Sequence, residues 1–415
     1  MRIGVVGLGY VGLPLAVAFA EAGHDVVGYD VDDERVALLA GGESDIEDVE
    51  SPRLAALSEK FTATSEDEHL AVCDAILICV PTPLAAEREP DLRYVRDSTE
   101  TIAKILRKGQ LVVLESTTYP GTTREELLPV LERGGMKVGE DFHLAYSPER
   151  IDPGRSDHQI ATTPKVVGGM TPACVDRATE VYSQVCDEVV PVSSPEAAEL
   201  SKLLENIFRS VNIALVNELA QLTDRLGIDI WEVIDAASSK PFGFMRFEPG
   251  PGMGGHCLPV DPFYLAYKAR QHDFYTEFVE LAGKINQSHP LFCVSKVQHA
   301  LNDAGKAVNG SKVLLIGVSY KAGVADLREA PSLKILRHLR ELGAEVSYHD
   351  PLIPALEEEG LDSADLDAAV AAADAVAIIT AHPGIDYEKL VADAALVVDF
   401  RGVTRGFDAP NVVLL

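Results

Sequence analysis

One cysteine has neighbours that are almost all glycine or proline. Cys257 lies in the segment 249–262, PGPGMGGHCLPVDP, where four preceding glycines permit the backbone to approach a ligand closely. Asp261 and Pro262 are typical of the N-cap and first position of a helix, so Cys257 is expected just before a helix N-terminus. A thiolate is favoured there. A buried structural cysteine is the alternative, and the adjacent His256 is interpreted as mostly structural.

A reactive thiolate has a specific use in an enzyme that also removes hydride. Oxidation of an alcohol to an aldehyde needs no cysteine, whereas oxidation of the aldehyde to an acid does. The thiolate attacks the aldehyde, the thiohemiacetal loses hydride, and water hydrolyses the remaining thioester. This chemistry also needs a base and groups that stabilise a negatively charged oxygen.

Candidates for these accessory roles lie on a helical pattern and at a strand end. Lys202 and Asn206 are four residues apart in SKLLEN, so they share one helical face and could hold an oxyanion. A solvated helix face is the alternative for this pair. Glu149 follows a predicted strand in SPER and offers a carboxylate, for which a surface loop is the alternative.

The N-terminal segment has the pattern of a dinucleotide-binding site. The run 7–12, GLGYVG, matches GxGxxG between a strand and a helix, and Asp30 ends the next strand 18 residues later. The glycines allow backbone N–H groups to approach a pyrophosphate, which the helix N-terminus also stabilises. A carboxylate at residue 30 binds a ribose 2′-hydroxyl and repels a 2′-phosphate, which favours NAD over NADP. A purely structural turn and a flavin or other nucleotide are the alternatives. The predicted NAD contacts in this segment are Gly7, Gly9, Tyr10, Val11, Gly12 and Asp30.

Two further strand ends carry hydroxyl and carboxylate groups. VPTP places Thr82 after one predicted strand, and ESTT places Glu115 and Thr117 after another. The carboxyl ends of parallel strands line one crevice, so these residues are candidates for cofactor or substrate contacts. Ordinary turn chemistry explains such clusters equally well.

These residues need a scaffold in which strands and helices alternate. The strand-like runs of the first part are 2–7, 24–29, 75–80, 111–115 and 143–146. Helical patterns between them predict a parallel, doubly wound α/β sheet. From 195 to about 302 long helical patterns dominate, the clearest at 196–226, with one Gly- and Pro-rich interruption at 240–262.

The last part of the chain resembles the first. KVLLIGVSY at 312–320 parallels RIGVVGLGY at 2–10, and Asp350 falls at the position of Asp30. Ser319 and Ala322 replace the second and third glycines of the motif, so this copy is expected to have lost dinucleotide binding. Chance similarity between two βαβ units is the alternative, and both interpretations give an α/β fold.

Composition limits the classes of partner. The 415 residues include 36 Lys+Arg and 65 Asp+Glu, a net charge of −29, which disfavours nucleic acid and anionic membranes as main partners. A solvated acidic surface is the simplest interpretation, and adaptation to high salt is a further hypothesis. The sequence contains no apolar stretch long enough for a membrane span, and the N-terminus reads as a strand rather than a signal peptide. Six scattered cysteines without a CxxC pair predict neither a zinc site nor disulfides, so a reduced cytoplasm is expected.

Together these motifs resemble the UDP-glucose/GDP-mannose dehydrogenase family over essentially the whole chain. The motifs, in chain order, are GLGYVG, VPTP, ESTTYPG, YSPERIDPG, SKLLEN, GPGMGGHC-x3-D and SYKAGVADLRE. The resemblance implies a four-electron oxidoreductase that converts a nucleotide-sugar C6 alcohol to a uronic acid with two NAD+. It also implies two Rossmann-like domains joined by a central helical region that dimerises or forms a higher homo-oligomer. The corresponding parts of this chain are 1–194 for NAD, 195–302 for the helical region and 303–415 for the UDP-sugar.

The resemblance also assigns roles to individual residues. Cys257 would be the nucleophile, Lys202 and Asn206 would stabilise the oxyanion, and Asp261 would activate water together with Lys202. Thr117 would position a catalytic water, and Glu149 would assist proton transfer. Thr82, Glu115 and Arg328 would join the NAD contacts. The implied substrate contacts are Glu149, Arg150, Lys202, Asn206, Gly254, Lys321 and Arg401.

Departures within the family indicate the sugar. PERIDPG, in place of the PEFL of the UDP-glucose branch, and His256 before the cysteine resemble the N-acetylhexosamine branch. SPERIDPG, LLEN, KPFGF and GPGMGGHCLPVDPFYLAYKAR most resemble UDP-N-acetylglucosamine 6-dehydrogenases. UDP-N-acetylmannosamine is the near alternative, followed by UDP-glucose. A non-catalytic NAD-binding module and a simple alcohol dehydrogenase that stops at the aldehyde are competing function classes.

Overall fold

The chain folds into two compact units. The computed structural model describes residues 1–415 apart from 47, 86–88, 151–158 and 256, and describes only the backbone of residue 257. The N-terminal unit comprises Met1–Glu205 and Phe263–Tyr275, and the C-terminal unit comprises Asn206–Pro262 and Thr276–Leu415. The boundary falls inside helices α7 (Pro195–Leu226) and α9 (Cys257–Arg270), so the helical middle section contributes to both units. The division of the sequence at 194 and 302 stays a prediction.

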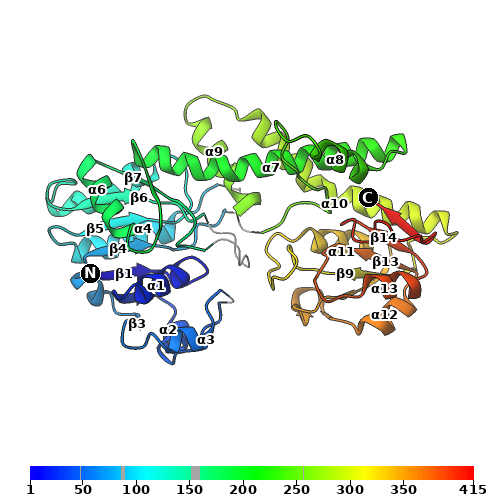
Figure 1. Cartoon of the computed structure of the whole chain (residues 1–415), viewed down its shortest axis with the longest axis horizontal. Coiled ribbons are helices and arrows are strands. Elements are labelled where there is room, and N and C mark those ends of the chain that lie inside the picture. The colour runs from blue at the N-terminus through cyan, green and yellow to red at the C-terminus, as the bar shows by residue number, and fades with distance from the viewer. Residues whose placement is uncertain (47, 86–88, 151–158, 256) are drawn as a thin grey trace. The chain divides into compact units, whose positions relative to one another are not determined.

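The N-terminal unit is built on an eight-stranded sheet of order β3-β2-β1-β4-β5-β6-β7-β8 (Figure 1). Its strands are β1 (Arg2–Val6), β2 (Asp25–Tyr29), β3 (Phe61–Thr64), β4 (Ala75–Ile78), β5 (Leu111–Leu114), β6 (His143–Tyr146), β7 (Lys165–Gly169) and β8 (Val189–Val192). The order reverses between β1 and β4, and the crevice at such a point is where doubly wound sheets bind ligands. The five strands predicted from the sequence for this region all occur, with ends one or two residues shorter in four of them.

Short helices connect these strands. They are α1 (Gly12–Glu21), α2 (Asp33–Ala40), α3 (Ser51–Ala55), α4 (Arg93–Ile105), α5 (Leu128–Leu131) and α6 (Pro172–Tyr182), with 3₁₀ turns at Asp67–Val72 and Glu132–Gly134 and a π-helical turn at Thr123–Leu127. Side-chain caps fix two of their starts. Asp32 accepts hydrogen bonds from the backbone N–H groups of residues 34 and 35, and Thr171 accepts one from that of Cys174.

One pair of strands departs from the predicted parallel sheet. β6 and β7 are antiparallel, with Ala145 opposite Gly169 and Tyr146 opposite Gly168, whereas the other adjacent pairs are parallel. A parallel return requires a long crossover, usually a helix, and the described part of the connection 147–164 contains no helix. The five strands predicted from the sequence are parallel to one another, as expected, and the antiparallel pair involves β7, which the sequence analysis did not predict.

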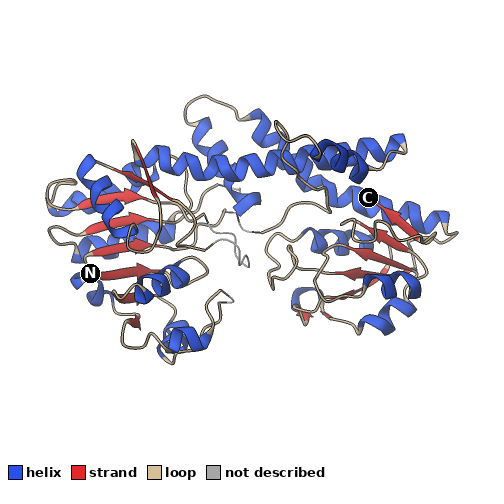
Figure 2. Cartoon of the chain, viewed as in Figure 1, coloured by secondary structure: helices blue, strands red, loops and turns tan. Residues whose placement is uncertain are grey.

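The C-terminal unit contains a five-stranded parallel sheet of order β10-β9-β13-β14-β15 (Figure 2). Its strands are β9 (Lys312–Ile316), β10 (Glu345–His349), β13 (Ala375–Ile378), β14 (Val397–Asp399) and β15 (Val412–Leu414), and a small hairpin pairs β11 (Ala355–Leu356) with β12 (Leu361–Asp362). Its helices besides the shared α7 and α9 are α8 (Ile230–Ser238), α10 (Glu277–Asp303), α11 (Pro331–Glu341), α12 (Leu366–Ala372) and α13 (Tyr387–Asp393), with a 3₁₀ turn at Glu357–Glu359.

Two apolar cores cover opposite faces of this second sheet. Val313 and Leu315 pack in one core with residues of α8, α10 and α11, whereas Leu314 and Ile316 pack in another with residues of α12 and α13. Alternate residues of one strand thus face two helical layers, which is the arrangement of a doubly wound sheet. The predicted fold class is confirmed in both units.

The two sheets share a topology. The order β10-β9-β13-β14 corresponds to β2-β1-β4-β5, which supports the internal repeat inferred from the sequence. The copies differ after their first strand, because α1 begins at Gly12 whereas α11 begins only at Pro331. Among the described helices, none combines the length and apolar character that a membrane crossing needs.

Candidate active site

The turn after β1 has the geometry that a dinucleotide requires. Gly7 has φ +89°, a left-handed conformation that favours glycine, and its N–H donates to the carbonyl of Tyr29 at 2.8 Å. A Cβ on Gly12 would lie 1.8 Å from the carbonyl oxygen of Gly7, so only glycine lets α1 begin this close to the turn. The N-terminus of α1, which is the positive end of its helix dipole, therefore lies directly after β1, where it favours a phosphate.

The remaining residues of this turn also fit NAD. A Cβ on Gly9 would meet nothing within 4 Å, so the backbone there is open to a ligand, and Tyr10 is exposed. The Asp30 carboxylate accepts from the N–H of Leu8 at 2.8 Å and from that of Asp32 at 3.1 Å. These bonds fix the carboxylate at the end of β2, and a carboxylate oxygen has a second lone pair for a ribose hydroxyl. Gly7, Gly9, Gly12 and Asp30 are thus the residues that would hold NAD.

The VPTP and ESTT segments meet, as their positions at neighbouring strand ends predicted. The Thr82 hydroxyl donates to the carbonyl of Thr117 at 2.8 Å, and the Tyr264 hydroxyl donates to the carbonyl of Thr82 at 2.8 Å. Thr82 is buried and its hydroxyl is engaged inside the protein. Tyr264, on α9, had no sequence signal, because its partner lies about 180 residues earlier in the chain.

A buried carboxylate anchors the ESTTYPG segment to α7. Glu199 accepts from the N–H groups of Gly121 at 2.6 Å and Thr123 at 2.9 Å, and from the Thr123 hydroxyl at 2.7 Å. Burial raises the pKa of Glu199 to about 7, against the lowering effect of these hydrogen bonds. This residue, also missed from the sequence, fixes the loop that follows Thr117.

A cluster of buried charges lies at the ends of β5 and β6. Lys165 Nζ lies 2.6 Å from Glu115 Oε2 and 3.6 Å from Glu149 Oε2, and the Tyr182 hydroxyl donates to Glu115 Oε1. Burial raises the pKa of Glu115, and Lys165 opposes that rise. Burial lowers the pKa of Lys165, but the two carboxylates outweigh burial and hold it above its ordinary value. Neither Lys165 nor Tyr182 was a candidate, because KVVGG and the α6 sequence match no functional motif.

Two groups bind the guanidinium of Arg150, which is partly exposed. Its guanidinium lies 2.7 Å from Glu205 Oε1 and donates to the carbonyl of Pro164 at 2.7 Å. Its backbone N–H donates to Glu149 at 2.7 Å. The neighbouring residues 151–154 of the predicted YSPERIDPG motif lie outside the described residues.

Lys202 is the second buried lysine of the N-terminal unit. It is only 8 % exposed on α7, and within the described part of the chain its ammonium has no hydrogen bond or ion pair. A buried ammonium without a counter-charge is costly, and such groups occur mainly at functional sites. The role of Lys202 stays a prediction that this burial supports.

Asn206 and Asp261 lie together in the C-terminal unit. Asn206 Nδ2 donates to Asp261 Oδ2 at 2.5 Å, and both residues are buried. The prediction of Asp261 as an N-cap is wrong, because α9 already begins at Cys257 and places Asp261 one turn inside it. The Asp261 carboxylate instead accepts a hydrogen bond from Asn206, and Pro262 lies within the helix. The predictions for the Cys257 side chain and for His256 fall outside the described residues.

The glycines before Cys257 pack tightly against the C-terminal unit. A Cβ on Gly254 would lie 2.7 Å from the Cβ of Tyr320, and one on Gly250 would lie 2.5 Å from the guanidinium of Arg401. The N–H of Gly255 donates to the carbonyl of Arg328 at 2.9 Å. These glycines therefore allow close backbone packing around Tyr320 and Arg401, and their predicted close approach to a ligand stays a prediction.

The cations predicted to bind ligands in the C-terminal unit have different environments. Burial lowers the pKa of Arg401, against the raising effect of Glu248 and Asp399. The backbone N–H of Arg401 donates to Asp399 at 2.8 Å, which fixes the start of the loop after β14. Arg328 forms a close ion pair with Asp326 at 2.6 Å. The carbonyl of Lys321 accepts from the Ser319 hydroxyl at 3.0 Å.

Protein groups occupy the second copy of the dinucleotide turn. Asp350 accepts from the N–H groups of Val318 at 2.8 Å and Ser319 at 3.0 Å, and His382 Nε2 lies 3.1 Å from the same carboxylate. Burial raises the pKa of Asp350, but these hydrogen bonds outweigh it and hold the pKa at about 2. Asp350 corresponds to Asp30 of the first copy, and the ring of His382 lies beside its carboxylate.

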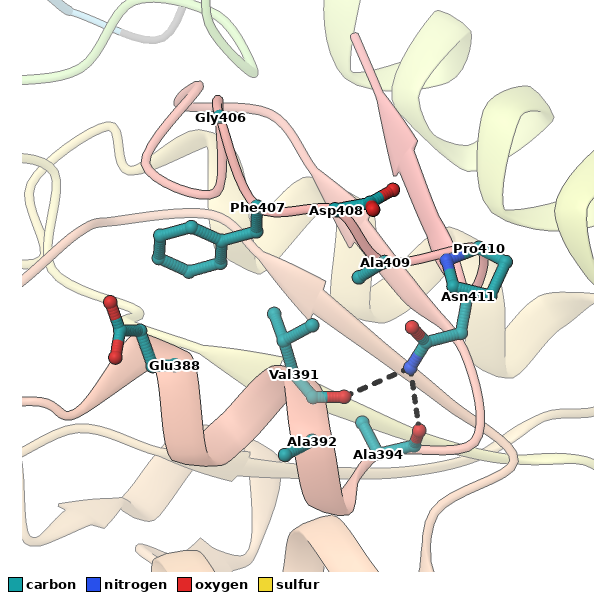
Figure 3. Close-up of a pocket in the computed structure, with 10 residues that line it drawn as sticks. All are labelled: Glu388, Val391, Ala392, Ala394, Gly406, Phe407, Asp408, Ala409, Pro410 and Asn411. Atoms are coloured by element: carbon teal, nitrogen blue, oxygen red, sulfur yellow. Dashed lines mark hydrogen bonds between the residues drawn. The ribbon is translucent and has the colours of Figure 1, made fainter.

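A hollow of about 670 Å³ lies in the C-terminal unit between α13 and the loop before β15 (Figure 3). The Asn411 amide donates to the carbonyls of Val391 at 2.9 Å and Ala394 at 2.8 Å. The carboxylates of Glu388 and Asp408 belong to the lining, which disfavours an anionic ligand. None of the residues predicted for the active site lines this hollow, so it lies apart from the predicted site.

Comparison with known proteins adds three family matches in chain order. The NAD binding domain of the UDP-glucose/GDP-mannose dehydrogenase family matches residues 1–186, its central domain matches 196–288, and its UDP binding domain matches 314–406. The matches cover most of the chain.

Individual relatives match over nearly their whole length. The UDP-N-acetyl-D-glucosamine 6-dehydrogenase of Pseudomonas aeruginosa is 39% identical over 358 residues, which cover 86% of this chain and 84% of that protein. The UDP-N-acetyl-D-mannosamine dehydrogenase of Pyrococcus horikoshii is 34% identical over 98% of this chain and 100% of its own. The solved structure of UDP-D-ManNAc dehydrogenase from Pyrococcus horikoshii superimposes with a TM-score of 0.91 at 32% identity, covering 100% of this chain and 98% of that one.

Proposed function

The chain belongs to the UDP-glucose/GDP-mannose dehydrogenase family, and from this premise we propose that it oxidises the C6 alcohol of UDP-N-acetylglucosamine to the uronic acid. Its cofactor is NAD, and its reaction is an oxidation of a UDP-sugar. The observation that carries the proposal is the 39% identity to a UDP-N-acetyl-D-glucosamine 6-dehydrogenase over 84% of that protein. UDP-N-acetylmannosamine is the alternative substrate, because relatives at 34% identity are named for it, and UDP-glucose comes third.

The proposed chemistry proceeds in two oxidations. NAD, when bound, accepts a hydride in each of them. The C6 hydroxyl first loses its proton and a hydride, which gives the aldehyde. The Cys257 thiolate then adds to the aldehyde carbon, and loss of a second hydride from the thiohemiacetal gives a thioester. Water hydrolyses the thioester and restores the thiolate, so one sugar consumes one water and yields two NADH.

Charged and polar groups on two helices suit the accessory steps. The buried ammonium of Lys202 and the amide of Asn206 are donors that would stabilise the oxyanions formed at C6. Asp261, which accepts from Asn206 at 2.5 Å, lies four residues from Cys257 on α9 and would activate water. Thr117 would position that water, and Glu149 would assist proton transfer.

The C-terminal unit offers groups for the UDP-sugar. Arg401 and Lys321 are cations that would bind the diphosphate, and Gly254 would let the backbone approach the sugar. We assign Arg150 and Glu149 to the sugar as well. Arg328 and Glu115 are proposed for NAD, although each has an internal partner, Asp326 and Lys165 respectively.

We further propose that the protein is a homodimer or a higher homo-oligomer. The described part of α7 in the C-terminal unit exposes a run of large apolar side chains at helical spacing: Phe208, Leu215, Leu219, Leu222 and Leu226. An apolar stripe on a long helix needs a partner surface, and a second copy of the chain supplies one. Light scattering on the wild type and on Leu222→Glu measures the mass, and a monomeric wild type would contradict the proposal.

The described cysteines support a reducing compartment. Cys73, Cys79, Cys174, Cys186 and Cys293 are all free and buried. Free thiols persist where thiol-based reductants keep them reduced, which supports the proposal of a cytoplasmic enzyme.

The number of NADH molecules formed per sugar tests the proposed function. Purified protein is incubated with NAD+ and, separately, with UDP-N-acetylglucosamine, UDP-N-acetylmannosamine, UDP-glucose and GDP-mannose, at several salt concentrations. Two NADH and one uronic acid per UDP-N-acetylglucosamine are expected. One NADH per sugar would indicate an alcohol dehydrogenase that stops at the aldehyde, and NAD binding without turnover would indicate a binding module.

The Cys257→Ser variant tests the cysteine mechanism. It should bind NAD like the wild type but form no acid, because a hydroxyl is too weak a nucleophile for the thioester route. Cys73→Ser is the matched control, since Cys73 is buried near β4 and the new hydroxyl can still donate to the carbonyl of His69. Unchanged acid formation in Cys257→Ser would reject the mechanism.

A further inference from the structure

The reversal of β7 brings a lysine to the edge of the sheet where ligands bind. β4, β5 and β6 are parallel, so their carboxyl ends meet at one edge. β7 is antiparallel to β6, so its first residue, Lys165, lies at that same edge. The register pairs 145 with 169 and 146 with 168, and its continuation places residue 149 opposite residue 165. The strand pairing itself therefore sets Lys165 beside Glu149.

The three charged groups form a chain from the interior outward. The side chain of Glu115 is fully buried, that of Lys165 is 7% exposed and that of Glu149 is 17% exposed. Lys165 lies between them, 2.6 Å from Glu115 and 3.6 Å from Glu149. The Tyr182 hydroxyl donates to the other oxygen of Glu115, so the inner end of the chain is fixed. Glu149 is the member that a ligand can reach.

Lys165 supplies a positive charge to both carboxylates. Tyr182, Cys79 and Cys186 also face the cluster, and burial raises the pKa of each, so these three groups are neutral at pH 7. The guanidinium of Arg150, next to Glu149, pairs with Glu205. Like-charge repulsion from Glu149 raises the pKa of the buried Glu115, and the ammonium of Lys165 opposes that rise.

We propose that Lys165 is a positioning residue of the active site, which holds the Glu149 carboxylate in place for proton transfer through their ion pair. The inference rests on the proposed function, in which Glu149 assists proton transfer. Lys165 is itself nearly buried and pinned by Glu115, so it acts through Glu149 and not on the substrate. A purely structural ion pair would need only Glu115, whereas Glu149 also lies 3.6 Å from the same ammonium.

The Lys165→Met variant tests the proposal through its kinetics. Its kcat should fall at least about tenfold at pH 7, since general acid–base assistance contributes roughly 10²–10⁴-fold. The acidic limb of its pH profile should move to higher pH, because Glu149 would then bind a proton more tightly. Lys165→Arg should restore most of kcat, since arginine keeps the charge.

Two further variants separate positioning from folding. In the double variant Lys165→Met/Glu149→Gln, kcat should equal that of Glu149→Gln alone, because Lys165 would act only through Glu149. The variant Lys165→Met/Glu115→Gln removes both charges of the buried ion pair, so no unpaired charge remains in the interior. Its kcat should still be low. Lys137→Met is the matched control, since Lys137 forms an exposed ion pair with Glu132 and should keep the wild-type kcat.

The outcomes distinguish this inference from the proposed function. If the wild type forms two NADH per sugar and Lys165→Met keeps its kcat and pH profile, the role of Lys165 is overturned and the proposed function stands. Additive losses in the Glu149 double variant would overturn it as well. A carbon-13 NMR titration of the Glu149 carboxyl, assigned with Glu149→Gln, gives a readout independent of turnover. A Glu149 titration that is the same in wild type and Lys165→Met would also overturn the role, and an upward shift would support it.

Discussion

The amide of Asn206 on α7 donates a hydrogen bond to the carboxylate of Asp261 on α9 at 2.5 Å. The two residues are 55 positions apart in the chain, and both are buried. The bond fixes the orientation of the amide and of the carboxylate at once. In the proposed mechanism one of these groups faces the oxyanion and the other faces water, so a change in either one disturbs both roles.

Replacement of Asn206 by alanine should therefore affect stability and turnover together. Asp261 would lose this donor, which costs about 1–3 kcal/mol for a buried polar group. Loss of one oxyanion donor should lower kcat about 100-fold. Urea denaturation and steady-state NADH formation measure the two effects, while NAD binding should not change.

Asn212→Ala is the matched control on the same helix. The Asn212 amide donates only to the carbonyl of Phe208 at 2.7 Å and lies near the surface. Its removal should leave kcat within about twofold of the wild type. If Asn206→Ala retained full turnover, Asn206 would have no part in oxyanion stabilisation.

Two glycines of the N-terminal turn should respond differently to alanine. Gly12→Ala would place a Cβ 1.8 Å from the carbonyl oxygen of Gly7, so the turn must shift and both stability and NAD binding should fall. Gly9→Ala meets no neighbour within 4 Å, so the protein should fold normally but bind NAD at least about tenfold more weakly, since the methyl group faces the pyrophosphate. Calorimetric NAD titration and thermal melting separate the two cases.

Gly134→Ala controls for the loss of a glycine in an open position. A Cβ there also meets nothing within 4 Å, and Gly134 lies far in the sequence from the turn. This variant should bind NAD normally. Wild-type NAD affinity in Gly9→Ala would place the pyrophosphate away from this turn.

The sequence predicts best what is local in the chain. The turn at Gly7, Gly9 and Gly12 is set by glycine geometry within six residues, and Asp30 follows from the next strand. The capping signal at Asp261 and Pro262 was equally local, yet wrong, because the carboxylate bonds to Asn206 instead. A short motif does not show that Asn206, 55 residues away, binds the carboxylate that was expected to cap the helix.

Non-local strand pairing hides the rest of the site. Lys165 has no motif, and its place beside Glu149 depends on the antiparallel pairing of β7 with β6. Glu199 reaches Gly121 and Thr123 across about 77 residues, so it too has no local signal. Residue types and motifs in the sequence identify candidate side chains such as Glu149. The strand pairing and the long-range contacts determine which other residues lie beside them.

The buried His289 should make the protein less stable in mild acid. Its ring is buried on α10, Nδ1 lies 3.2 Å from the Gln221 amide, and burial lowers its pKa from 6.5 to about 4. The unfolded chain binds a proton below pH 6.5 that the folded chain refuses until about pH 4. The stabilising contribution is therefore complete above pH 6.5 and is lost as the pH falls toward 4.

Because of this shifted pKa, the free energy of unfolding should fall by about 2 kcal/mol between pH 7 and pH 5. Urea denaturation at the two pH values measures it, and His289→Gln should reduce the difference by that amount. His299→Gln, which changes an exposed histidine on the same helix, should not. An equal pH dependence in wild type and His289→Gln would show that His289 is protonated in the folded protein.

The acidic surface should make stability depend on salt. The chain carries 65 acidic against 36 basic residues, and many of the bases already lie in exposed ion pairs such as Arg53–Glu21 and Arg93–Asp91. The excess carboxylates therefore repel one another, and at about 10 mM ionic strength this repulsion extends over about 30 Å, against about 3 Å at 1 M. Dialysis from molar salt into dilute buffer should lower the melting temperature and the rate of NADH formation, and restored salt should recover both.

Sodium chloride and potassium chloride should act alike, because screening depends on ionic strength rather than on a bound ion. Full stability and activity in dilute buffer would rule out adaptation to a high-salt interior as the reason for this charge.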